Sequence, residues 1–391
     1  MRSTIYQRRS LKTLKLHVIN IILVSVLLLL EGIIKTPLTN AMVLIGLLLF
    51  GSIFYPIDLK LTSFRLLTKF VKARGPIKWI ALYLMLAFFS LAWTSDTYRS
   101  LFYIAITTAF CFLLLFWLIT DINNFGNLLD KSLKFLFIVI GLKFIFKLMY
   151  WNFSTPIMNL LHGLGGFEAA AILVILFFKS QIDRFPITPF FFAIFILVLG
   201  TSLKAYISIA VFVFMYFFFS KGTFSKVLLS LITLLSIYYI YVNLDSSVDL
   251  GKLEHGSGRI PIFLYLLEKY INADIFNQIL GFGYVVGDKF EMGNVIFYNS
   301  HNLFLSALLN LGLVGFYIQI KVLTSSITLS FNQIKASKKI RAVCIASVFM
   351  IYTNALVNQS LAGIISGPFA ASFIILIILT AASNPKWFES I

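Results

Sequence analysis

Long apolar runs recur along the whole chain and constrain its fold more than any other feature. A helix needs roughly 20 mostly apolar residues to cross a bilayer, and runs of about that length alternate here with short polar connections. Of the 391 residues, 60% are hydrophobic and 12% are charged, which excludes a soluble globular enzyme, a disordered tail and a fibrous repeat. We therefore expect an all-α integral membrane protein, with residues 1–391 forming one polytopic domain of about twelve spans. The spans are expected at 17–34, 39–57, 79–95, 100–120, 132–151, 165–180, 186–202, 203–220, 224–243, 302–320, 342–360 and 363–381.

Lysine and arginine gather in every second connection between these runs, as they do in cytoplasmic loops of membrane proteins. The first 15 residues, the 58–78 connection and the 321–341 connection are the most basic segments. We therefore expect both termini in the cytoplasm, and we attribute the net charge of +17 to cytoplasmic loops rather than to a nucleic-acid partner. The first apolar run is too long for a signal peptide, so we expect an uncleaved first span.

Cysteine, histidine and carboxylate spacing gives no sign of a metal centre. Cys111 and Cys344 both lie inside apolar runs, the four histidines are scattered, and no paired carboxylates stand at ligand spacing. We expect neither a disulfide framework nor a bound metal.

One connection, residues 244–301, differs from all others because it is long and holds seven of the fifteen acidic residues. Alternation of the spans places it outside. Long connections are usually functional. Pro261 suits a first helical turn, and the stretch 262–271 reads as a short amphipathic helix on the membrane surface.

This outer loop also carries the residues best suited to chemistry. Arg259, after Gly256-Ser257-Gly258, offers a planar fork for phosphate oxygens, and His301, before Asn302, can move a proton near neutral pH. Gly281 and Gly283 permit a tight turn or a close backbone approach. The alternative interpretation is structural. Arg259 would extend its charged end to the membrane–water interface, and His301 would cap the end of a span.

The order of these motifs resembles the bacterial O-antigen ligase/polymerase family. The resemblance covers Gly256 to Gly315: Gly258-Arg259, a short helix, Leu280-Gly281-Phe282-Gly283, His301-Asn302, and Leu311-Gly312-Leu313-Val314-Gly315. Outside this stretch only the twelve-span layout agrees. The resemblance implies a GT-C-like membrane glycosyltransferase of the bacterial inner membrane, acting at its periplasmic face.

The resemblance also implies roles for particular residues. Arg259 and His301 stand where the family has its loop arginine and histidine, and Lys204 stands where the family has a second arginine. The chain departs from the family pattern at Phe263, where the family often has tryptophan, and lacks a proline before Leu280-Gly281.

The function implied is a polysaccharide polymerase that transfers a growing glycan from undecaprenyl pyrophosphate to a lipid-linked repeat unit. Arg259 and Lys204 would bind the diphosphate, and His301 would accept the proton of the acceptor hydroxyl. No cofactor is implied; expected partners are the undecaprenyl-pyrophosphate-linked oligosaccharide, membrane lipids, a chain-length regulator and a flippase. Two alternatives stay open: an O-antigen ligase that transfers the glycan to lipid A–core, and a polysaccharide transporter or flippase.

Charged residues inside the spans form a separate signal, because such residues are costly in lipid and usually have a partner. Lys143 and Lys147 are four residues apart in the fifth run, and Glu168 begins the sixth run at a similar depth. We expect Lys147 to pair with Glu168, either as a structural ion pair or as part of a diphosphate-binding cavity that includes Lys147.

Overall fold

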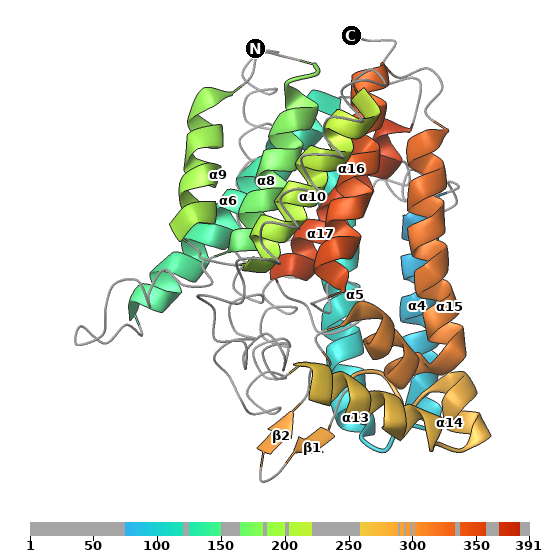
Figure 1. The fold of residues 1–391 in the computed structure, drawn as a ribbon. Helices are drawn as coiled ribbons and strands as arrows, with labels where there is room; N and C mark the ends of the chain where they lie inside the picture. The colour runs from blue at the N-terminus through green and yellow to red at the C-terminus, as the bar shows by residue number, and fades with distance from the viewer. Residues whose placement is uncertain are drawn as a thin grey trace, which may run out of the picture.

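The protein is described by a computed structural model over residues 75–119, 125–149, 165–182, 186–199, 203–220, 259–287, 290–292, 295–297, 300, 302–332, 337–356 and 367–383. These residues are almost all helical, with one two-stranded hairpin, so the all-α prediction is confirmed (Figure 1). The elements in order are α4 (Pro76–Phe89), η1 (Ser90–Ala92), α5 (Thr97–Ile119), α6 (Phe125–Met149), α8 (Gly166–Lys179), α9 (Ile187–Leu199), α10 (Leu203–Ser220), α13 (Arg259–Ile271), α14 (Ile275–Leu280), β1 (Phe290–Met292), β2 (Val295–Phe297), α15 (Leu303–Phe331), α16 (Lys338–Ala355) and α17 (Gly367–Ala382).

Nine of the twelve predicted apolar runs fall on these helices. The other three, 17–34, 39–57 and 224–243, lie outside the described residues. Among the described residues, α15 is the one helix both long and apolar enough to cross a membrane by itself, and α4 with η1, α9, α10 and α17 supply shorter apolar helices. The helical identity of these nine runs is thus established, while the number of membrane spans in the chain stays a prediction.

Helices α8 and α17 form the centre of the described bundle. Almost every residue of both is buried, including the alanines Ala169–Ala171 and Ala370–Ala371. A helix that is apolar on all faces belongs in an interior, and the small alanine side chains let neighbouring helices approach closely. Helix α17 accordingly packs against α8, α6, α15 and α4.

An ion pair joins α6 and α8 at one end of this bundle. Lys179, in the last turn of α8, donates to the carboxylate of Asp130, near the start of α6. Both residues lie at the ends that the charge pattern places at the cytoplasmic face.

The predicted span at 302–320 falls on a helix that is not continuous. Helix α15 breaks at Leu311 (φ −131°, ψ 17°) and Gly312 (φ 63°, ψ −160°), and the chain continues as a second helical segment. The rings of Phe304 and Phe316 lie 6.0 Å apart by their centroids, whereas an unbroken helix would separate the two residues by about 18 Å along its axis. The first segment of α15 therefore folds back towards the second.

Candidate functional site

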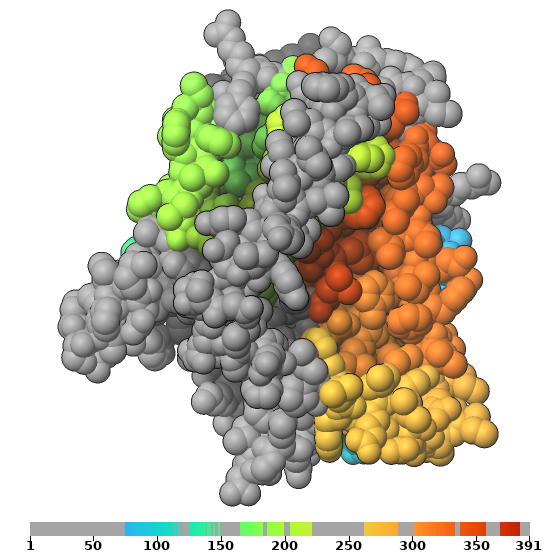
Figure 2. Space-filling model, viewed as in Figure 1, coloured from blue at the N-terminus to red at the C-terminus, as the bar shows by residue number. Residues whose placement is uncertain are grey.

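Helices α13 and α14, the hairpin and the first segment of α15 gather at the lower end of the molecule in Figure 1, beside α4 and α5. Figure 2 shows the surface of α13 and α14 in yellow at this end, next to the orange surface of α15. This group contains the described part of the predicted 244–301 loop and is the candidate site.

The predicted amphipathic helix of the loop is confirmed as α13, which begins at Arg259. Its inward face carries Leu266, fully buried against Leu309 of α15, with Ile262 and Tyr270 beside them. Its outward face exposes Leu264 and Ile271. The helix is thus held by a small apolar core of its own.

A network of polar contacts fixes α14 after α13. The Asp274 carboxylate caps α14 by accepting hydrogen bonds from the backbone N–H and side-chain amide of Asn277 (2.9 and 2.6 Å). These hydrogen bonds hold the pKa of the exposed Asp274 carboxyl below its usual value. The Tyr270 hydroxyl donates to the carbonyl of Gln278 (2.9 Å), so α13 and α14 form one rigid corner.

The glycine turn, residues Gly281–Gly287, is buried rather than exposed at the surface. Gly281 (φ 76°) and Gly283 (φ 104°) both have backbone angles that side chains disfavour. A Cβ on Gly281 would lie 2.4 Å from the carbonyl carbon of Asn310, and one on Gly283 would lie 2.3 Å from the Thr94 hydroxyl. The predicted close backbone approach is confirmed for Gly281, whereas the nearest neighbour of Gly283 is the Thr94 side chain.

The glycine turn fills the break in α15. The backbone N–H groups of Phe282 and Gly283 donate to the carbonyls of Leu309 and Asn310, at 2.9 and 3.0 Å. Those carbonyls end a helical segment and therefore lack their usual partners four residues on. The loop supplies the missing hydrogen bonds, which explains how a helix can break at Gly312 without leaving buried carbonyls unpaired.

The opposite side of the glycine turn is held by the connection between α4 and α5. The Ser90 hydroxyl accepts from the N–H of Tyr284 (3.1 Å), and the Ser100 hydroxyl donates to the Tyr284 carbonyl (2.7 Å). The indole N–H of Trp93 donates to the Gly281 carbonyl (3.1 Å). The turn therefore lies between α15 and the connection from α4 to α5, and is hydrogen-bonded to both.

Sequence reasoning missed Lys269 of α13. Its ammonium donates to the carbonyl of Gly287 (3.1 Å) and lies 4.8 Å from the centroid of the Phe282 ring. Both contacts are to the glycine turn. Lys269 of α13 therefore holds this turn together with α15 and the α4–α5 connection. A lysine on an amphipathic helix resembles an interface anchor in the sequence, and no local signal distinguishes the two roles.

Asn302 does more than end the loop. Its side-chain oxygen accepts from the N–H groups of Phe304 and Leu305 (both 2.9 Å), so it is the N-cap of α15. Its amide donates to the carbonyl of Leu356 at the end of α16 (3.0 Å). The capping function that the structural interpretation gave to His301 therefore belongs to Asn302.

The remaining predicted residues are only partly described. Arg259 is the first residue of α13, but its side chain, Gly258 and His301 lie outside the described part of the structure. Lys204 is half-buried in the first turn of α10, where its carbonyl accepts from the Ser208 hydroxyl (2.7 Å). The prediction that Arg259, His301 and Lys204 meet in one cavity stays a prediction.

The predicted Lys147–Glu168 pair is described on one side only. Glu168 is 2% exposed in the first turn of α8. Lys147 lies on α6, which packs against α8, but its side chain and that of Lys143 lie outside the described residues. The pairing stays a prediction.

Within the described ranges, no three His, Cys, Asp or Glu side chains lie close enough together to hold a metal ion. Comparison of the chain with models of known protein families and with curated proteins finds no match.

Proposed function

We propose that this chain is a polysaccharide polymerase of the bacterial inner membrane. It would transfer a growing glycan from undecaprenyl pyrophosphate to a lipid-linked repeat unit at the periplasmic face. The observation that carries the proposal is the docking of the glycine turn into the α15 break. This docking gives a structural reason for the order of motifs on which the resemblance rests, because Leu280-Gly281-Phe282-Gly283 and Leu311-Gly312 contact each other.

The surface of the helices supports a lipid environment. Large apolar side chains remain exposed on α4, α9, α10 and α15, among them Phe88, Phe89, Phe191, Phe195, Phe217, Leu313 and Tyr317. A surface of this kind is costly in water and favourable against lipid tails. It fits an integral membrane protein.

The proposed reaction uses cationic and titratable groups of the outer loop. The acceptor hydroxyl oxygen attacks the anomeric carbon of the donor sugar, and the bond from that carbon to the diphosphate oxygen breaks. Arg259, with Lys204, offsets the negative charge that grows on the departing undecaprenyl pyrophosphate. His301 accepts the proton of the acceptor hydroxyl. The glycan is already activated by its diphosphate, so no nucleotide takes part.

The glycine turn links these roles to the fold. Arg259 begins α13, which packs on the first segment of α15 through Leu266 and Leu309. Residue 301 directly precedes the N-cap Asn302 of the same segment. A rigid turn between α13 and the first segment of α15 would keep Arg259 and His301 at a constant distance and orientation. Preorganised charge stabilisation requires such fixed positions.

A broken helix is also a feature of many secondary transporters, where the break lines a substrate cavity. In α15, however, the carbonyls of Leu309 and Asn310 are hydrogen-bonded by the glycine turn. The break is filled by the chain's own backbone, which favours a scaffold for an outer-face site over a transport path.

The test is a reconstitution of the purified protein with undecaprenyl-pyrophosphate-linked repeat units. We expect a ladder of lengthened lipid-linked chains. Glycan joined to lipid A–core without a ladder would identify a ligase instead. Movement of the lipid-linked glycan across vesicles with no new glycosidic bond would identify a transporter and contradict the enzyme proposal.

A further inference from the structure

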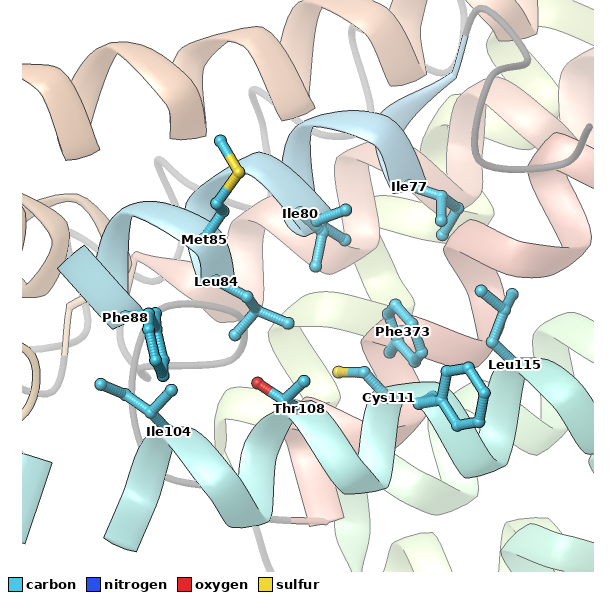
Figure 3. Close-up of a pocket in the computed structure, with 12 residues that line it drawn as sticks. Ile77, Ile80, Leu84, Met85, Phe88, Ile104, Thr108, Cys111, Leu115 and Phe373 are labelled. Atoms are coloured by element: carbon cyan, nitrogen blue, oxygen red, sulfur yellow. The ribbon is translucent and has the colours of Figure 1, made fainter. Parts of the chain in front are cut away.

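An apolar groove of about 400 Å³ runs between α4 and α5. Figure 3 shows Ile80 and Leu84 of α4 facing Thr108 and Cys111 of α5, with Phe373 of α17 between the two helices. From Ile77 to Phe88 the groove follows α4 for about 16 Å. Its lining is apolar apart from the Thr108 hydroxyl and the Cys111 thiol.

The rim of the groove is open on the outside of the bundle. Ala81, Met85, Phe88 and Phe112 contribute to the lining and are exposed. In a membrane this face would meet lipid tails, so a long, flexible hydrocarbon chain could enter sideways from the bilayer. Because the tail comes from a surrounding that is already apolar, its binding would depend on van der Waals packing in the groove rather than on the hydrophobic effect.

The outer end of the groove meets the candidate site. Phe88 lines this end, and Ser90, two residues on, is the residue that binds the N–H of Tyr284 in the glycine turn. A lipid tail in the groove would therefore place its head group next to the turn.

A basic residue stands at the same end. Arg99 lies in the first turn of α5, with its guanidinium carbon 5.7 Å from the Tyr103 ring centroid, and Ile104 of the groove follows about 1.4 helical turns later. The Asp96 carboxylate beside it accepts from the backbone N–H of Arg99 as the cap of α5. Arg99 lies about 180° around α5 from Thr108 of the groove, so its guanidinium is not part of the proposed binding site.

We propose that the α4–α5 groove binds the hydrocarbon tail of the polyprenyl diphosphate that carries the donor glycan. The inference rests on the proposed function for the identity of the lipid. Its own evidence is the apolar lining, the lateral opening and the continuity of the groove with the glycine turn.

The test captures the occupant directly. The photo-reactive residue p-benzoylphenylalanine is placed at Ala81, on the groove rim, or at Ala210, an exposed position on α10 outside the groove. The purified full-length proteins are irradiated in nanodiscs of phosphatidylethanolamine and phosphatidylglycerol containing undecaprenyl phosphate, and adducts are identified by mass spectrometry. We expect an undecaprenyl phosphate adduct at position 81, enriched at least about tenfold over position 210.

Other outcomes overturn the inference. Equal capture of undecaprenyl phosphate at both positions, or capture of phospholipid alone at position 81, would make the groove ordinary lipid-facing surface. A cross-link from position 81 to a peptide within 17–57 would mean that the chain itself covers the groove.

This experiment separates the groove from the proposed function because capture needs no acceptor and no transfer. If position 81 captures undecaprenyl phosphate but the wild-type protein makes no ladder, the groove proposal stands and the polymerase proposal is wrong. As a second measurement, Ala81→Trp is expected to raise the half-saturating concentration of the lipid-linked repeat unit about tenfold, with Ala210→Trp as the matched control. If Ala81→Trp makes the ladder with an unchanged half-saturating concentration, and the photo-reactive residue at position 81 gives no undecaprenyl phosphate adduct, the groove proposal is wrong and the polymerase proposal stands.

Discussion

The backbone N–H of Gly283 donates a hydrogen bond to the carbonyl oxygen of Asn310, and the two atoms lie 3.0 Å apart. With the parallel bond from Phe282 to Leu309, it joins a loop to the interior of a broken helix. The contact requires glycine on both sides, because a Cβ on Gly312 would lie 2.3 Å from the backbone of Ile279. Two glycine motifs that are separate in the sequence thus form one structural joint.

Replacement of Gly281 by alanine should destabilise this joint. The backbone at Gly281 has φ 76°, and the new Cβ would lie 2.4 Å from the backbone of Asn310, which cannot move independently. We expect a cost of about 1–3 kcal/mol, seen as a lower midpoint of thermal denaturation in detergent. The control is Gly141→Ala in α6, where a Cβ meets nothing within 4 Å and helix propensity improves. Equal midpoints for the two variants would show that the turn does not contribute to stability.

Lys269 should hold the glycine turn in place. In Lys269→Met the turn loses the hydrogen bond to Gly287 and the cation over Phe282, together about 1–3 kcal/mol. Hydrogen exchange of residues 282–287 should accelerate, whereas Lys339→Met, at an exposed position of α16, should leave it unchanged. Identical exchange in both variants would remove Lys269 from the support of the turn.

The cap of α14 should respond to acid. Because hydrogen bonds to the carboxylate lower the pKa of Asp274 in the folded protein, its stabilising contribution is complete above the unfolded pKa of about 3.9. The contribution is lost as the pH falls through the lower, folded pKa. Hydrogen-exchange protection of residues 275–280 should therefore drop in acid below about pH 4 in the wild type. Asp274→Asn keeps an acceptor but does not titrate there, so the same drop in this variant would contradict the explanation.

If Lys147 and Glu168 form an ion pair, losing one partner should be worse than losing both. Glu168 is buried, and an isolated charge at such a site is more costly than two neutral side chains. Lys147→Met and Glu168→Gln should each lower the amount of folded protein in the membrane, and the double variant should recover part of it. Additive losses would mean that the two side chains do not interact.

Several elements followed directly from local sequence. The apolar runs marked nine helices, and Pro261 with the amphipathic pattern after it marked α13. Asn302 before an apolar run is a typical helix N-cap signal, although the structural interpretation of the sequence assigned the cap to His301. The hairpin was missed, although Gly293-Asn294 between Phe290-Glu291-Met292 and Val295-Ile296-Phe297 has the length and residue types of a two-residue hairpin loop.

The break in α15 had no such signal. Leu311 and Gly312 lie within a continuous apolar run, and a glycine in such a run is compatible with an intact helix. The break becomes favourable because the glycine turn pairs the carbonyls of Leu309 and Asn310. That pairing joins residues about 27 positions apart in the sequence and depends on tertiary structure, as do the contacts of Lys269.

The most direct test of the account compares Arg259→Lys and His301→Ala with the wild type in the reconstituted polymerase assay. Arg259→Lys keeps the charge but loses the bidentate fork, so we expect severe impairment. His301→Ala should still bind the donor but transfer it more slowly, by a factor on the order of 10²–10⁴ if the histidine is the general base. Single-turnover rates and donor binding, measured on protein of equal thermal stability, separate the two effects. Wild-type ladder synthesis by the double variant Arg259→Ala/His301→Ala would contradict the account.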